Sequence, residues 1–150
     1  MIETECQKLV VDAVTAHGGR ALKFNNQFLV GVVDLLIKLP TYPAFVLEAK
    51  KNDFAASTIN RDGAFTFNLD VTTKQKQFLN DWYGAGMRTG VISFIQQKGS
   101  NVNSLRVACY SKVDLRRRGW VAMIQDHVPL GDKSRRNETL VAMLTSFAGG

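Results

Sequence analysis

The stretch Phe45-Val46-Leu47-Glu48-Ala49-Lys50-Lys51 (FVLEAKK) places charged residues inside an apolar run. Residues 44–50 predict a buried strand. Because side chains alternate along a strand, Glu48 and Lys50 share one face and Ala49 lies on the other. Burying either charge without a partner carries a large free-energy cost. Either the strand reaches solvent at Glu48, or a further group such as a metal ion requires these charges there.

The preceding apolar run, residues 31–39 (GVVDLLIKL), is interrupted in the same way by Asp34. A short connection with two prolines follows it, so a hairpin with residues 44–50 is the simplest pairing. That pairing would bring Asp34 close to Glu48. Neighbouring carboxylates raise each other's pKa unless a cation lies between them. Mg²⁺ is typically bound by one or two carboxylates, water and phosphate oxygens.

The two strands therefore predict a divalent metal site between Asp34 and Glu48. Lys50, on the same face as Glu48, would orient or help to deprotonate an attacking water, or stabilise charge on a phosphate. For an isolated E-x-K pattern a solvent-exposed strand end would be the simpler explanation. The second carboxylate in an equally apolar setting favours the metal site.

The rest of the chain predicts an α/β fold of one domain, residues 1–150, with a mixed sheet and helices packed on it. Apolar spacing and turn residues predict the order α-β-β-β-α-β, followed by additions. We expect Trp82 and Tyr83 on the inner side of the second helix, and Asn137 as a cap of the last one. The predicted segments are helix 3–17, strand 20–25, strands 31–39 and 44–50, a long loop 52–71, helix 72–85, strands 90–96 and 105–110, and helix 137–147. Residues 114–124 are left unassigned.

Composition narrows the class of protein. The chain has 150 residues, of which 45% are hydrophobic and 21% charged, as in folded soluble proteins. There is no apolar run near the roughly 18–20 residues that a membrane span needs. The first residues are acidic where a signal peptide would be basic, so a cytoplasmic location is expected. Cys6 and Cys109 form no metal-ligand pattern and are expected to be reduced and buried.

The net charge of +6 is unevenly distributed. Residues 1–71 hold seven basic and eight acidic residues, a net −1, whereas residues 72–150 hold twelve and five, a net +7. A basic half of this kind favours a polyanion such as DNA as partner, although a merely solvated basic surface is an alternative. The candidate phosphate contacts are Lys23, Lys51, Arg116, Arg117, Arg118, Lys133, Arg135 and Arg136.

Several segments together resemble the PD-(D/E)xK nuclease superfamily, and within it the VRR-NUC and Holliday-junction resolvase-like branch. The matching pieces are Glu5 on the first helix, the G-V-V-D of residues 31–34 and the E-A-K of residues 48–50. A T-x-x-Q segment, residues 72–75, precedes the next predicted helix and the strand GVISF. Val33 replaces the proline that VRR-NUC domains usually carry. The resemblance covers about residues 3–95, and residues 96–150 show no family signal.

The resemblance implies a restriction-endonuclease-like fold and a metal-dependent deoxyribonuclease. Asp34, Glu48 and the carbonyl of Ala49 would bind Mg²⁺ or Mn²⁺, and Lys50 would position the water. Gln75 would orient groups at the edge of the site. Glu5, preferred to the neighbouring Glu3, would bind the metal indirectly or complete a second site.

The expected function is hydrolysis of DNA phosphodiester bonds by an endonuclease, at branched or junction DNA. Because 150 residues leave little room for a separate sequence-reading domain, specificity would come from DNA shape, a homodimer or a protein partner. A phage or mobile element would be a natural source. The alternatives are a non-catalytic DNA-binding or protein-interaction module, and a basic structural protein that binds without metal.

Overall fold

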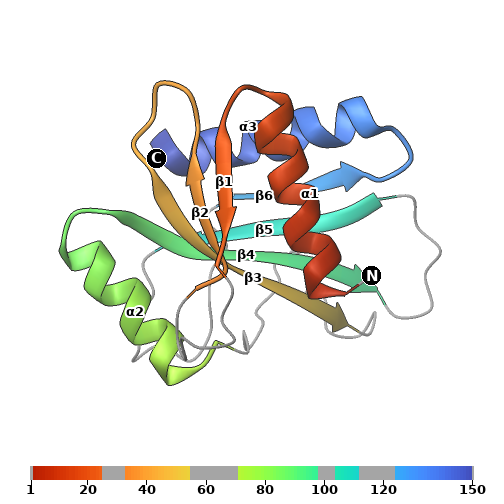
Figure 1. Cartoon of the computed structure of the whole chain (residues 1–150). Coiled ribbons are helices and arrows are strands. Elements are labelled where there is room, and N and C mark those ends of the chain that lie inside the picture. Colours follow the sequence, from red (N-terminus) through yellow and green to blue (C-terminus); the bar gives the residue numbers. More distant parts are fainter. Residues whose placement is uncertain (1, 25–32, 55–70, 98–103, 112–123, 150) are drawn as a thin grey trace.

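A computed structural model describes residues 2–24, 33–54, 71–97, 104–111 and 124–149. In this part of the chain, six strands and three helices follow one another as α1-β1-β2-β3-α2-β4-β5-β6-α3 (Figure 1). Their bounds are α1 Glu3–Ala16, β1 Arg20–Lys23, β2 Leu35–Lys38, β3 Phe45–Phe54, α2 Thr73–Gly84, β4 Arg88–Gln97, β5 Ser104–Ser111, β6 Ile124–Pro129 and α3 Lys133–Gly149. The fold is therefore α/β, as predicted.

The strands form one mixed sheet in the order β1-β2-β3-β4-β5-β6. Strands β1, β2 and β3 form an antiparallel meander, β4 runs parallel to β3, and β5 and β6 continue antiparallel. Helix α2 makes the crossover that the parallel pair requires. The predicted hairpin of β2 and β3 is confirmed by the pairing of Leu35 with Leu47 and of Ile37 with Phe45.

The two faces of the sheet differ in their cover. Helices α1 and α3 pack against each other on one face, and α2 lies on the other (Figure 1). Strand alternation sends Phe45, Leu47 and Ala49 into the large apolar core below α1 and α3. Val46 belongs to a smaller core on the α2 face, with Leu79 of α2. Both cysteines are buried, as expected.

Three local features explain how the elements end or pack. Gly18 adopts a φ of +83°, which favours glycine, and ends α1 before β1. Gly90 in β4 lies against the ring of Phe147, so a Cβ there would overlap Phe147 and the carbonyl of Tyr110. Arg135 N donates to Asp132 Oδ1 at 3.2 Å, which caps the start of α3.

Four sequence predictions need correction. Helix α3 begins at Lys133, so Asn137 is a buried residue within the helix and not its cap. Trp82 and Tyr83 are 44% and 45% exposed and are not core residues. The buried residue of α2 is Leu79. Strand β3 extends to Phe54, beyond the predicted residue 50. Strand β6 was not predicted; it is stabilised by pairing with β5, a contact distant in sequence. The 55–70 part of the predicted loop lies outside the described residues.

In the described part of the chain, no helix is both long and apolar enough to cross a membrane.

Candidate functional site

Glu48 is a charged-type residue in the interior, with 2% of its surface exposed. Its position follows from the strand register, because β2 begins at Leu35 opposite Leu47. Past this point β3 has no β2 partner, and the residue before Leu35, Asp34, lies beside Glu48 on the same face. The side chain of Glu48 therefore projects from the α2 face of the sheet, just past the end of the β2–β3 pairing.

Asp34 is held by backbone contacts at the start of β2. Its carbonyl accepts a hydrogen bond from Phe24 N at 2.8 Å, and its Oδ2 accepts one from Ala49 N at 3.1 Å. Burial, the charge of Asp34 and a hydrogen bond with Asp34 raise the pKa of Glu48 from 4.5 to about 8, although Lys50 acts to lower it. The predicted closeness of Asp34 and Glu48 is therefore confirmed, and without a bound cation the raised pKa favours a protonated Glu48 at neutral pH.

Gln75 joins the site from the first turn of α2. Thr72 Oγ1 accepts from Gln75 N at 3.1 Å, and Gln75 Oε1 accepts from Thr72 N at 3.0 Å, so the two residues form a capping box. With Oε1 engaged in this way, the amide nitrogen Nε2 faces the sheet and donates to Glu48 Oε1 at 3.0 Å. The cap that starts α2 thus also orients one ligand-like group of the site.

Lys50 connects the site to the start of α1. Its Nζ lies 3.5 Å from Glu48 Oε1 and 3.9 Å from Glu3 Oε1, and its side chain is 13% exposed. Glu5 instead accepts a hydrogen bond from Ile2 N at 2.8 Å, at the start of α1. The structure thus brings Glu3 to Lys50, whereas this hydrogen bond of Glu5 lies within the start of α1.

A cation fits the carboxylate pair for a specific reason. Glu48 Oε2 is buried and has no hydrogen-bond donor within the described part of the chain, because a hydrogen bond between the Glu48 and Asp34 carboxyls requires a proton on one of them. A proton or a metal ion would satisfy this acceptor beside Asp34. Ala49 donates its N–H to Asp34, and since a strand residue directs its N–H and C=O to one side, the Ala49 carbonyl faces Asp34 as well.

The donor set is small. Across the described ranges, no group of three or more His, Cys, Asp and Glu side chains could hold a metal ion. Two carboxylates and one carbonyl match the sparse protein ligation of Mg²⁺, which retains several waters, better than a closed cage.

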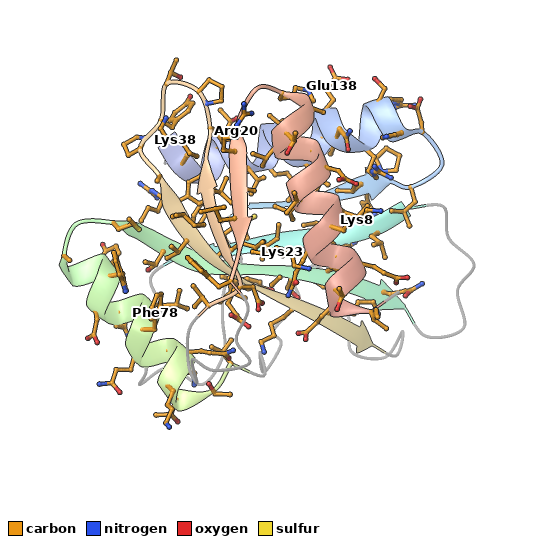
Figure 2. The ribbon with its side chains drawn as sticks, viewed as in Figure 1. Lys8, Arg20, Lys23, Lys38, Phe78 and Glu138 are labelled. Carbon is orange, nitrogen blue, oxygen red and sulfur yellow. The ribbon has the colours of Figure 1, made fainter. Side chains whose placement is uncertain are left out.

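The candidate phosphate contacts are placed apart from one another. Lys23 ends β1 and is exposed, and Figure 2 labels it together with Lys8 of α1. These two lysines line a depression of about 230 Å³, which Thr4, Glu5 and Val11 complete. Lys51 lies on the face opposite Glu48, where its charge lowers the pKa of Cys6, although burial raises that pKa overall to about 12.

The basic clusters of the second half are not brought to Glu48 by the contacts of the described chain. Lys133, Arg135 and Arg136 lie in the first turn of α3, which packs against α1, β5 and β6. Arg136 donates to Asn137 Oδ1 at 3.4 Å. Arg116, Arg117 and Arg118 lie outside the described residues.

Two residues at the site were not assigned from the sequence. Glu3 contacts Lys50. The only signal for this contact in the sequence was that Glu3 lies at the start of the first predicted helix. Ser93 is buried in β4 and is paired in register with Lys50. A single serine within the apolar strand GVISFIQ was the available signal.

In comparisons with family models, with curated proteins and with solved structures, no match to the chain was found.

Proposed function

We propose that this protein is a metal-dependent deoxyribonuclease that hydrolyses phosphodiester bonds of branched or junction DNA. The observation that carries the proposal is the buried Glu48 carboxyl, which lies beside Asp34 and has one oxygen without a hydrogen-bond donor in the described chain. An apolar core gains nothing from such a pair, whereas a cation site requires it. The order of elements, with an antiparallel meander followed by a parallel β4, supports a restriction-endonuclease-like fold, and the PD-(D/E)xK resemblance adds to this support.

Each site residue has a chemical task in this proposal. Asp34, Glu48 and the Ala49 carbonyl would hold Mg²⁺ or Mn²⁺, which when bound polarises a phosphate oxygen and lowers the pKa of a coordinated water. Lys50 would donate to the attacking water or to the phosphate, from a position held by Glu48 and Glu3. Gln75 donates to Glu48 Oε1, which leaves Oε2 as the carboxylate oxygen without a donor in the described chain.

The proposal is tested by a cleavage assay on fluorescent duplex, single-stranded, flap and four-way-junction DNA. Each substrate is incubated with Mg²⁺, with Mn²⁺ and with EDTA. We expect cutting only with metal, faster on flap or junction DNA than on blunt duplex. Asp34→Ala and Glu48→Ala should each lower the rate by about 100-fold or more, the size usual for loss of metal-assisted catalysis.

The matched control is Glu138→Ala, because Glu138 is an exposed acid on α3, away from α2 (Figure 2). This variant should cut like the wild type. If the wild type cuts none of the substrates, or if the Asp34 and Glu48 variants cut as well as Glu138→Ala, the enzyme proposal is wrong. Metal-independent binding with a steep salt dependence would then favour a DNA-binding module.

A further inference from the structure

Helix α2 carries an aromatic pair that the smaller core buries only in part. Phe78 and Trp82 lie four residues apart, and their ring centroids are 5.7 Å apart with an angle of 33° between the rings. Phe78, labelled in Figure 2, is partly buried against the smaller core, whereas Trp82 is 44% exposed. Trp82 therefore presents aromatic surface to solvent beside Phe78.

This aromatic pair is continuous with the candidate site. Gln75, which donates to Glu48, belongs to the same helix. Trp82 follows seven residues later, about 10 Å along the helix axis at 1.5 Å per residue. Since one strand of B-form DNA advances about 3.4 Å per nucleotide, the pair lies within about three nucleotides of a phosphate bound at Glu48.

Charge complements the aromatic surface. Lys74 is exposed and lies four residues before Phe78, so Lys74, Phe78 and Trp82 form one row along α2. Lys76 adds a second cation to the same turn, and with Asp81 the helix α2 carries one net positive charge. A row that combines a cation with stacked rings suits a nucleic-acid strand, because the phosphate pairs with the amine and the base stacks on the ring.

We infer that the Phe78–Trp82 pair stacks an unpaired base of the DNA whose phosphate lies at the Glu48 site. The inference rests on the proposed function, which it deepens: the substrate class is DNA with a single-stranded segment next to the cut, as in a flap or an opened junction. In a closed duplex the bases are paired and their faces are covered, so the aromatic pair has no base to stack.

The test measures binding of two fluorescein-labelled 15-nucleotide probes by anisotropy, in EDTA, with the full chain. One probe is oligodeoxythymidine and the other is an abasic strand of the same length and charge. Wild type should bind the thymidine probe more tightly. Trp82→Ala should weaken that binding by about 5- to 100-fold and leave abasic binding unchanged, because stacking on each base is lost and the charge contacts remain.

Tyr83→Ala is the matched control, since Tyr83 is 45% exposed and adjacent on the same helix but is turned about 100° away. It should bind both probes like the wild type. Trp82→Phe should restore most of the base-dependent binding, and Phe78→Leu, which keeps an apolar side chain, should lose part of it. Circular dichroism checks that each variant is folded.

Three results would overturn the inference: equal binding of both probes by the wild type, unchanged thymidine binding by Trp82→Ala, or an equal loss with Tyr83→Ala. The result is separable from the proposed function. Base-dependent binding through Trp82 without any metal-dependent cleavage would refute the nuclease and keep the stacking surface. Cleavage that depends on Asp34 and Glu48, with base-independent binding, would keep the nuclease and refute the stacking surface.

Discussion

The two faces of the sheet are built from the same strands and serve different ends. On the α1 and α3 face, β3 contributes Phe45, Leu47 and Ala49 to an apolar core. On the α2 face the same strand contributes Glu48, and β4 adds buried Thr89 and Ser93. One residue of offset along a strand therefore separates the apolar core from the candidate site. We expect changes on the first face to alter stability, and changes on the second to alter the metal response and activity.

The largest effect is expected from Glu48 and pH. Its pKa of about 8 in the folded chain lies above its ordinary value of 4.5. Between these values the unfolded chain has lost a proton that the folded chain keeps, so stability is highest below pH 4.5 and falls as pH rises towards 8. The slope is up to about 1.4 kcal/mol per pH unit. Glu48→Gln should remove this fall.

The measurement is urea unfolding of both proteins from pH 4.5 to pH 9 without metal. Glu138→Gln serves as control, because an exposed acid on α3 should leave the wild-type slope in place. If wild type and Glu48→Gln keep a constant difference over this range, Glu48 is ionised in the folded chain and the raised pKa is wrong.

The next effect tests the apolar face. Leu47 is fully buried next to Glu48 in the sequence, on the opposite side of the strand. Leu47→Ala should lower the free energy of unfolding by about 2–5 kcal/mol, the range for large-to-small core changes. Cleavage per folded molecule should stay near that of the wild type.

Leu22→Ala is the matched control, since Leu22 is 61% exposed on β1. Its unfolding free energy should change by no more than about 0.5 kcal/mol. A loss of specific activity in Leu47→Ala at temperatures where it is folded would show that the two faces are not independent.

The residues around Glu48 also show how much of the site could be predicted from the sequence. The Asp34–Glu48 pairing was predictable because strand alternation and a proline-marked turn are local properties. Trp82 was misplaced because helical spacing gives the direction of a side chain but not how far the sheet extends beneath it. The choice between Glu3 and Glu5 depends on tertiary reach to Lys50. Strand β6 could not be predicted, because the residues around Asp126 show little alternation of apolar and polar side chains and the strand forms by pairing with β5.

Addition of a divalent metal ion should stabilise the protein, and the size of this stabilisation should depend on pH. A divalent ion displaces the proton of Glu48, so its apparent affinity should rise up to about tenfold per pH unit below 8 and level off above it. At 100 times the dissociation constant, binding adds about 2.7 kcal/mol of stability. Thermal unfolding with and without Mn²⁺ at pH 6 and pH 8 measures this.

Glu48→Gln and Asp34→Asn should show no such increase, whereas Leu22→Ala should respond like the wild type. Equal stabilisation of all four proteins by Mn²⁺ would place the ion elsewhere on the chain, and the carboxylate pair would then lose its proposed role.

The smallest effect compares the two helix caps. Thr72→Ala removes the hydroxyl that accepts from Gln75 N, and Asp132→Ala removes the carboxylate that accepts from Arg135 N. Each should cost about 1 kcal/mol of stability, since both remove one N-cap. Only Thr72→Ala should also slow cleavage, by a few-fold, because its capping box orients Gln75 towards Glu48. Thr72→Ser should restore both properties. Equal loss of activity in the two alanine variants would mean that α2 contributes to the site only through overall stability, and that the Gln75–Glu48 hydrogen bond has no role of its own.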